Sequence, residues 1–251
     1  MCGIVGYTGK QSVAKQILDA LELLEYRGYD SAGMAIVDET NGQVQIRKRA
    51  GRVADLEKVW KANPVNGICG IGHTRWATHG GVSDVNAHPH RAGRVTLVHN
   101  GIIENYEELK DHFGLADELI SDTDSEVVAA VLNRFYTGDP HEALFQTVKC
   151  LKGTFALVVI FDDIPDVIFA IRNVSPIVAA YREDGTMLAS DVAALGGQAT
   201  SYMVVPEYHV VELHTDDIRV YNMKNELCEA EFLDIDWDTT RAGKGNYPFY
   251  M

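Results

Sequence analysis

The apolar positions near the start of the chain follow first a strand-like and then a helix-like spacing. Residues 2–8 form a short alternating run, which predicts a strand. From Val13 to Leu24, apolar residues recur three and four positions apart, the spacing that places them on one face of a helix. We therefore expect an amphipathic helix of about four turns, capped by Ser12 and ended by Gly28.

Further along, the pattern divides the chain into a helix-rich first half and a strand-rich second half. Asn41-Gly42 lies between two β-like runs and predicts a hairpin. Residues 77–94 show little apolar periodicity, which predicts a long loop of functional importance. The division favours an α+β fold with mostly antiparallel sheets. The expected helices are 54–62, 105–113, 124–136 and 141–151, and the expected strands are 32–37, 44–48, 95–99, 155–161, 166–171, 177–181, 187–189, 203–204, 209–213 and 218–221.

Composition and charge exclude several classes of protein. An apolar content of 46% is enough for a packed core, and a net charge of −14 repels nucleic-acid phosphates and anionic lipid surfaces. The longest uninterrupted apolar run, residues 155–161, is far shorter than the ~20 residues that cross a bilayer. The first residues show neither a basic leader nor a long apolar stretch. We therefore expect a cytoplasmic protein that binds neither nucleic acid nor membrane.

The four cysteines are widely spaced, which disfavours a disulfide framework, a zinc knuckle or a redox motif. Cys69, Cys150 and Cys228 lie in or beside apolar patterns, where small thiols are usually buried. Cys2 differs because removal of Met1 would free its α-amino group. That amine titrates near neutral pH, so a single residue would supply both a nucleophilic thiol and a base. Cys2 is therefore the candidate nucleophile.

Three internal segments place polar side chains where apolar runs end. Arg75 and Thr78 follow the run 68–72, and a guanidinium can hold a carboxylate with two hydrogen bonds. The pair Asn100-Gly101 ends a buried strand and offers a side-chain amide and a backbone N–H to a developing oxyanion. Asp124, in the first turn of a helix, could bind an ammonium group. An arginine for a carboxylate and an aspartate for an ammonium together predict a free amino acid as the ligand.

Each of these residues also has an ordinary structural interpretation. Arg75 could form a surface ion pair, Asn100-Gly101 a turn, and Asp124 a helix cap, a role open equally to Asp122 and Thr123. A group of histidines makes a metal site conceivable, but no cysteine or carboxylate completes a recognisable ligand spacing, so we expect no metal and no cofactor. These histidines are His73, His79, His88, His90 and His99.

Six motifs, in this order, resemble the glutaminase domain of the glutamine–fructose-6-phosphate aminotransferase family. They are CGIVGY at residue 2, LEYRGYDSAG at 24, GHTRWATHG at 72, NAHPH at 86, HNGIIENY at 99 and SDTDSE at 121. That family belongs to the class II glutamine amidotransferases, within the N-terminal-nucleophile hydrolases, and the resemblance extends over essentially the whole chain. It implies a four-layer αββα sandwich, in which two mostly antiparallel sheets lie between helical layers.

The resemblance also implies a reaction, the hydrolysis of L-glutamine to L-glutamate and ammonia through a γ-glutamyl thioester. Cys2 would be the nucleophile and its α-amine the base, and Asn100 with Gly101 would form the oxyanion hole. Arg75, assisted by Thr78, would hold the α-carboxylate of glutamine. The resemblance implies supporting roles for six further positions: Asp124 on the α-ammonium, Trp76 and His79 in a mobile loop, His88 at its lip, and Arg27 and Gly28 in the segment that packs on the N-terminus.

The resemblance further implies a division of the chain at residue 230. Residues 2–230 correspond to the glutaminase domain, and residues 231–251 resemble a linker toward a sugar-phosphate isomerase domain, no part of which is in this sequence. With that domain, a homo-oligomeric enzyme would make glucosamine 6-phosphate from fructose 6-phosphate. Val174 departs from the family, which usually has glycine at this position. We expect this departure to alter local strand geometry and not the chemistry.

Three other functions are compatible with parts of the pattern. One is the glutaminase half of an amidophosphoribosyltransferase, and another is a non-catalytic glutamine-binding domain that has kept the pocket. The third is a proteolytic N-terminal-nucleophile enzyme, which would prefer peptides to free glutamine. Activity in any catalytic case depends on removal of Met1, because a blocked Cys2 has no free amine.

Overall fold

Strands that are buried on both faces explain the long apolar runs of the second half. In the computed structural model, which describes residues 2–236, strand β7 (Gly153–Phe161) directs Leu157 and its alternate neighbours toward helices. Val158 and its alternate neighbours point the opposite way, into a layer between two sheets. Both sets are buried, so the strand reads as a continuous apolar run.

Two antiparallel sheets form the centre of the molecule. Within residues 2–236, one has the order β15-β11-β9-β10-β1-β4-β2-β3 and the other the order β14-β13-β12-β8-β7-β6-β5. The strands of the first sheet are β1 Gly3–Gly9, β2 Ser31–Val37, β3 Val44–Ala50, β4 Cys69–Arg75, β9 Val178–Arg182, β10 Gly185–Ala189, β11 Ser201–Val204 and β15 Leu233–Asp234. Those of the second, besides β7, are β5 His90–Ala92, β6 Val95–Ile103, β8 Ile164–Asn173, β12 Val210–His214, β13 Asp217–Tyr221 and β14 Leu227–Cys228.

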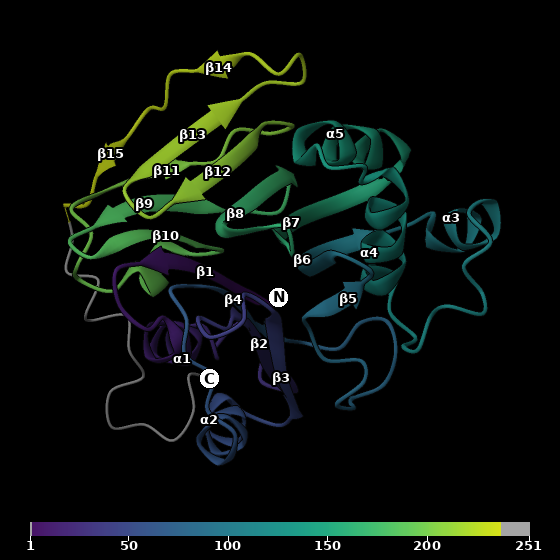
Figure 1. Ribbon diagram of the computed structural model, residues 1–251, viewed down its shortest axis with the longest axis horizontal. Helices are drawn as coiled ribbons and strands as arrows, with labels where there is room; N and C mark the ends of the chain where they lie inside the picture. The colour runs from purple at the N-terminus through teal and green to yellow at the C-terminus, as the bar shows by residue number, and fades with distance from the viewer. Residues whose placement is uncertain (1, 237–251) are drawn as a thin grey trace.

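Helices cover the outer face of each sheet (Figure 1). Helices α1 (Ala14–Leu23) and α2 (Val53–Ala62) pack on the first sheet, and α4 (Asp124–Phe135) and α5 (Pro140–Cys150) on the second, beside the shorter α3 (Tyr106–His112). A short 3-10 helix, η1, spans Val192–Leu195. One cluster of buried apolar side chains lies between the helices and the sheet on each side of the molecule, and a further cluster fills the space between the two sheets. The expected four-layer αββα sandwich is confirmed.

Most of the expected elements are present, but the predicted start and end of α1 and the predicted end of β6 were wrong. Ser12 does not cap α1: Val13 holds the cap position without a side-chain hydrogen bond, and the helix ends at Leu23, well before Gly28. Strand β6 does not stop before Asn100 and continues to Ile103, because β7 pairs with it along its whole length.

Four strands lie where the sequence pattern gave a weak signal or none: β5, which lies inside the expected loop 77–94, β14, β4 and β15. Strand β4 was recognised only as a short apolar run, because Gly70 and Gly72 interrupt its pattern. A Cβ atom on Gly72 would lie 2.5 Å from a side-chain carbon of Ile17, so close packing of α1 accounts for this residue. Strand β15 pairs with β11 and lies beyond residue 230, so the sheet extends past the expected domain boundary. Most of the linker-like segment 231–251 lies outside the described residues.

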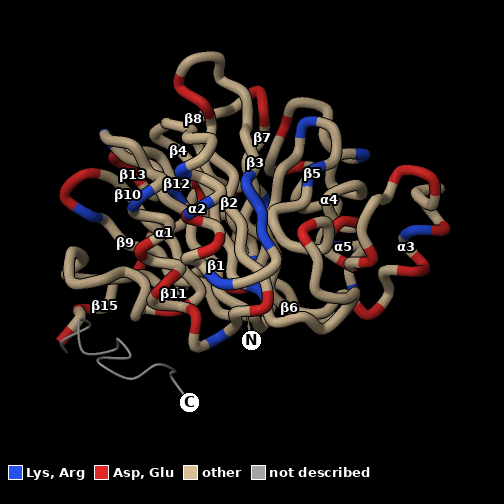
Figure 2. Tube along the Cα trace, turned by 90° about the horizontal axis from the view of Figure 1, so that it is seen from below, with Lys and Arg blue, Asp and Glu red and all other residues tan. Residues whose placement is uncertain are grey.

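Acidic positions occur in all of α1 to α5 but in few of the strands, whereas β3 carries one continuous basic stretch (Figure 2). Lys48, in that stretch, donates to the backbone oxygens of Val85 (3.0 Å) and Pro89 (3.3 Å). It thereby ties the long loop after β4 to the edge of the first sheet. Within residues 2–236, no helix combines the length and apolar character needed to cross a membrane.

The three internal cysteines pack as expected from their apolar neighbours. Cys69 is fully buried between the sheets, and Cys150 and Cys228 are partly buried against the apolar clusters. Burial raises the pKa of the Cys69 thiol. The Cys69 thiol is therefore structural.

Candidate active site

Cys2 lies where the two sheets meet. It immediately precedes β1 of the first sheet, and its backbone oxygen accepts a hydrogen bond from Asn100 Nδ2 (3.0 Å) on β6 of the second. The same oxygen accepts from Arg27 Nε (3.3 Å). Two residues that are far from Cys2 in the sequence therefore fix its backbone.

A small cavity of about 20 Å³ opens beside the Cys2 thiol. Most of the residues singled out from the sequence line it, Thr123 and His99 among them, together with Ser125, whereas Asn100, Arg27 and Gly28 do not. This volume holds about one water molecule. The expected residues that line the cavity are Cys2, Arg75, Trp76, Thr78, His79, His88, Gly101 and Asp124.

The Cys2 thiol is held by the backbone of Trp76. The Trp76 N–H donates to Sγ at 3.2 Å, and the thiol faces the Trp76 carbonyl oxygen at 3.6 Å. Burial raises the pKa of this thiol, although the Trp76 N–H and the charges of Arg75 and Arg27 act in the opposite direction. The thiol is therefore protonated at neutral pH and needs a base before it can attack.

Gly101 is a position that no other residue could occupy without disruption. Its φ is +133°, and a Cβ atom there would lie 2.0 Å from the backbone oxygen of Thr154. Strand β7 pairs with one edge of β6 along its whole length, whereas β5 pairs with the opposite edge only as far as Leu97. Beyond Leu97, no strand among the described residues pairs with that opposite edge. The Ile103 N–H at that edge donates to Asp124 Oδ2 (2.9 Å).

Asp124 is not the cap of its helix. Thr123 occupies the cap position of α4, with its hydroxyl accepting from the Glu126 N–H at 3.3 Å. Asp124 follows as the first helical residue, is buried, and lines the cavity. A carboxylate at this point is available to a ligand in the cavity.

Arg75 ends β4 and is buried, so it is not a surface ion pair. Its guanidinium donates to the backbone oxygens of His79, Gly80 (3.1 Å) and Gly81 (3.1 Å), which wraps the following loop around it. Asn86 secures this loop from outside, because its Nδ2 donates to Gly81 (3.0 Å) and its Oδ1 accepts from the Asp122 N–H (3.0 Å). Three of the six motifs meet at this point.

Arg27 and Gly28 pack against the site from the other side. The guanidinium of Arg27 pairs with Asp191 at 2.8 Å as well as holding Cys2. A Cβ atom on Gly28 would lie 2.8 Å from backbone atoms of Arg75 and Trp76. The sequence gave no signal for Asp191, which is 164 positions from Arg27.

Four of the candidate histidines form a buried group at the cavity, which two of them, His88 and His99, line. Burial lowers the pKa of His73 to about 3 and also lowers the pKa values of the others, so all four are neutral at pH 7. No cluster of three or more His, Cys, Asp or Glu side chains within residues 2–236 has the geometry of a metal site. The buried histidines are His73, His88, His90 and His99, and His79 instead contacts the ring of Tyr106.

Comparison with protein families agrees with this geometry. The glutamine amidotransferase domain family matches residues 37–247. This chain belongs to that family. A glutamine–fructose-6-phosphate aminotransferase of Clostridium acetobutylicum is 39% identical to this amidotransferase domain over 254 residues, and one of Streptomyces coelicolor is 43% identical over 257 residues. Each alignment covers all of this chain but only 41% and 42% of the relative, so the chain spans about two fifths of the length of these curated relatives.

Solved structures share the fold of this amidotransferase domain. Glutamine phosphoribosylpyrophosphate amidotransferase from B. subtilis superposes with a TM-score of 0.75 at 21% identity, covering 90% of this chain and 50% of that one. A glutamine aminotransferase class-II domain protein from Silicibacter pomeroyi has a TM-score of 0.64 at 17% identity, covering 88% of this chain and 99% of that one. At such identities the likeness concerns the fold alone.

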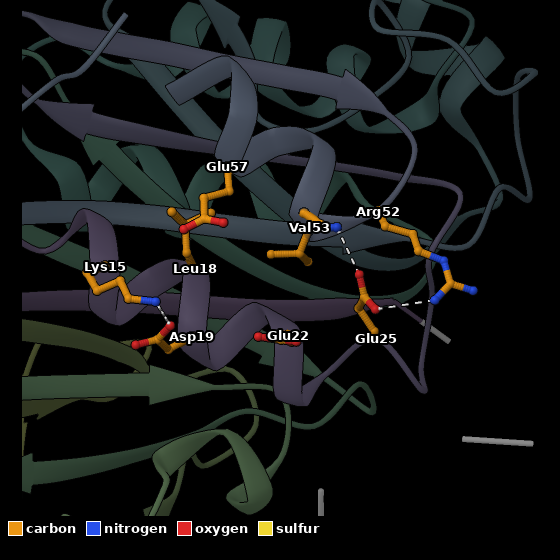
Figure 3. Close-up of a pocket in the computed structure, with 9 residues that line it drawn as sticks. Lys15, Leu18, Asp19, Glu22, Glu25, Arg52, Val53 and Glu57 are labelled. Carbon is orange, nitrogen blue, oxygen red and sulfur yellow. Dashed lines mark hydrogen bonds and ion pairs between the residues drawn. The ribbon is translucent and has the colours of Figure 1, made fainter. Parts of the chain in front are cut away.

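A larger cavity of about 220 Å³ lies elsewhere on the amidotransferase domain, between α1 and α2 (Figure 3). Its polar groups already serve the fold. Glu25 accepts from the Val53 N–H (2.9 Å) at the start of α2 and faces Arg52, while Lys15 pairs with Asp19. No thiol or histidine lines it. The small cavity beside Cys2 is therefore the better candidate for chemistry.

Proposed function

We propose that this domain hydrolyses L-glutamine to L-glutamate and ammonia, with Cys2 as the nucleophile. The observation that carries the proposal is the convergence of the Cys2 thiol, Gly101, a guanidinium and a carboxylate on one cavity, beside which Asn100 is hydrogen-bonded to the Cys2 backbone. A free amino acid with a side-chain amide is the ligand that uses all four groups. A purely glutamine-binding domain would need no nucleophile at this position.

The reaction begins once Met1 has been removed and the α-amine of Cys2 is free. This amine accepts the thiol proton, and Sγ attacks the side-chain amide carbon of glutamine. Asn100 Nδ2 and the Gly101 N–H donate to the oxygen that becomes negative. Collapse of the tetrahedral intermediate expels ammonia, which receives the proton from the α-amine. Water then hydrolyses the γ-glutamyl thioester, releasing glutamate and restoring the thiol.

Binding of glutamine requires a change in the loop that follows Arg75. The cavity of about 20 Å³ is far too small for glutamine, and loop backbone oxygens occupy the Arg75 donors. We propose that the α-carboxylate replaces these oxygens, assisted by Thr78, while the α-ammonium binds Asp124. Trp76, His79 and His88 then border the bound amino acid.

In a full-length protein, the ammonia would serve the synthesis of glucosamine 6-phosphate from fructose 6-phosphate. Relatives of that name are 39% to 43% identical to this chain, whereas the phosphoribosylpyrophosphate amidotransferase is 21% identical. This difference favours the hexosamine reaction over the alternative acceptor. The isomerase partner domain, the domain boundary, a homo-oligomeric full-length form and a cytoplasmic location stay predictions.

Labelling with a glutamine-mimicking electrophile tests the proposal. The processed domain should gain one adduct, located at Cys2 by peptide mass analysis, and excess L-glutamine should protect it. The partly buried Cys150 and Cys228 are internal controls and should stay unlabelled. Adducts at those thiols with none at Cys2 would refute the assignment of the nucleophile.

A further inference from the structure

His73 has no role in the reaction described above, yet it touches the residue that should stabilise the oxyanion. It lies on β4, is fully buried, and contacts β6 of the other sheet through a single ring nitrogen. His73 Nε2 is 3.0 Å from Asn100 Oδ1 and 3.1 Å from the backbone oxygen of His99. Neither neighbour of His73 in the sequence makes a contact of this kind.

The backbone oxygen of His99 determines which tautomer His73 adopts. A carbonyl oxygen can only accept a hydrogen bond, so the proton must be on Nε2 of His73. The other nitrogen, Nδ1, is buried and has no hydrogen-bond partner in the described structure. Burial lowers the pKa of His73 to about 3, which leaves the ring with this one proton at neutral pH.

The tautomer in turn determines the orientation of the Asn100 amide. Because Nε2 of His73 donates, the atom of Asn100 that faces it must be the oxygen. The amide nitrogen must then face Cys2, where it donates to the backbone oxygen at 3.0 Å. With the amide reversed, an oxygen would face the developing oxyanion and would repel it.

We propose that His73 is a positioning residue, which holds the Asn100 amide with its N–H groups toward the substrate. The inference rests on the proposed function, since it concerns the oxyanion site of that reaction. The ring of His88 packs against the ring of His73, with centroids 4.1 Å apart, and restrains its tilt. Orientation of the donor before substrate arrives is the source of oxyanion stabilisation.

A matched pair of substitutions tests the positioning role. In His73→Gln the side-chain NH2 can reach the place of Nε2, whereas in His73→Asn it reaches only the place of Nδ1. We expect His73→Gln to keep kcat within about threefold of wild type, and His73→Asn to lower kcat by ~10²-fold with KM nearly unchanged, approaching the loss of one oxyanion donor. Equal kcat values for the two variants would overturn the inference. If His73→Asn does not fold, a loss of ~10²-fold in His73→Gln would overturn it.

A double-mutant cycle separates this inference from the proposed function. In an Asn100→Ala background, His73→Asn should cause no further loss of kcat, because the amide it orients is gone. Losses that multiply would overturn the positioning role and indicate general damage. If Asn100→Ala lowers kcat and His73→Asn does not, the positioning role of His73 is overturned and the proposed function stands. Wild-type turnover in Asn100→Ala would overturn the oxyanion assignment itself.

Discussion

Two histidine clusters of this domain have pKa values that are shifted in opposite directions. At the candidate site, burial lowers the pKa values of His73, His88, His90 and His99, and no carboxylate within residues 2–236 is hydrogen-bonded to these rings. At the other cluster, burial acts in the same direction on His141, but hydrogen bonds to Glu212 and Asn225 outweigh it and raise the pKa. The hydrogen-bonded partner, and not burial alone, therefore decides in which direction the pKa of a buried histidine shifts in this fold.

The second cluster serves structure rather than chemistry. His141 on α5 donates from Nε2 to Glu212 (2.8 Å) on β12, and its Nδ1 contacts Asn225 in the turn before β14. Glu212 also accepts from His214 Nε2 at 2.9 Å. These contacts join helix α5, strand β12 and the turn before β14. No nucleophile is hydrogen-bonded to this network within the described residues.

If only the region around Cys2 serves catalysis, substitutions there should lower turnover and substitutions in the His141 cluster should not. The largest effect is expected for Asn100→Ala. Loss of one oxyanion donor should lower kcat for glutamine by ~10²- to 10³-fold with little change in KM. Steady-state ammonia release measures both constants. Glu212→Gln is the matched control from the second cluster and should keep the wild-type kcat. Wild-type kinetics in Asn100→Ala would contradict a catalytic role for the region around Cys2.

Arg75→Ala should affect binding more than turnover. Charge-assisted hydrogen bonds to a carboxylate contribute about 1.5–3 kcal/mol, so KM should rise by roughly 10- to 100-fold while kcat changes little. Arg49→Ala, which removes an exposed ion pair with Asp84, is the control and should leave KM unchanged. An equal fall of kcat in Arg75→Ala, with KM unaltered, would contradict a binding role.

The two clusters should respond to pH with opposite sign. The pKa of His73 is depressed to about 3, so wild type loses stability as pH falls below 6.5, and the cost of His73→Gln should shrink toward pH 5.5. The pKa of His141 is raised, so its contribution is complete below pH 6.5 and is lost as pH rises through the folded value. The cost of His141→Gln should therefore shrink toward alkaline pH. Each trend amounts to at most about 1.4 kcal/mol per pH unit in urea unfolding, and parallel trends would contradict the comparison.

The smallest effect is expected at Val174, which belongs to neither cluster. Its φ of +67° is unfavourable for a β-branched residue, and its side chain is 61% exposed. Val174→Gly should raise the free energy of unfolding by about 0.5–1 kcal/mol, since the relieved strain exceeds the added entropy of the unfolded glycine. Val174→Ala should raise the free energy of unfolding by a smaller amount. Loss of stability in Val174→Gly, measured by urea unfolding, would show that the conformation is not strained.

Sequence patterns predicted most helices and strands because their apolar residues are continuous or periodic. They failed where a local signal competed with packing. Asn100-Gly101 has the composition of a turn, yet β7 pairs with it and keeps it in a strand. Position 33, within β2, is a glycine because a Cβ atom there would be 2.0 Å from the backbone oxygen of His88.

The candidate site was predictable only as far as motifs identify residue types. Arg75, Asn100 and Asp124 were found from their chemistry, but the contact of His73 with Asn100 joins strands of two different sheets. Arg27 and Asp191 are likewise far apart in sequence. Long-range pairs of this kind leave no periodic trace, so only the folded chain reveals them.

The most direct test of the account is ammonia release from L-glutamine by a sample whose intact mass shows that Met1 has been removed. We predict steady release by the processed wild-type domain and a severe loss in Cys2→Ser. Absence of ammonia from the processed wild type, or undiminished release by Cys2→Ser, would contradict the assignment of Cys2 and its α-amine as the reacting groups.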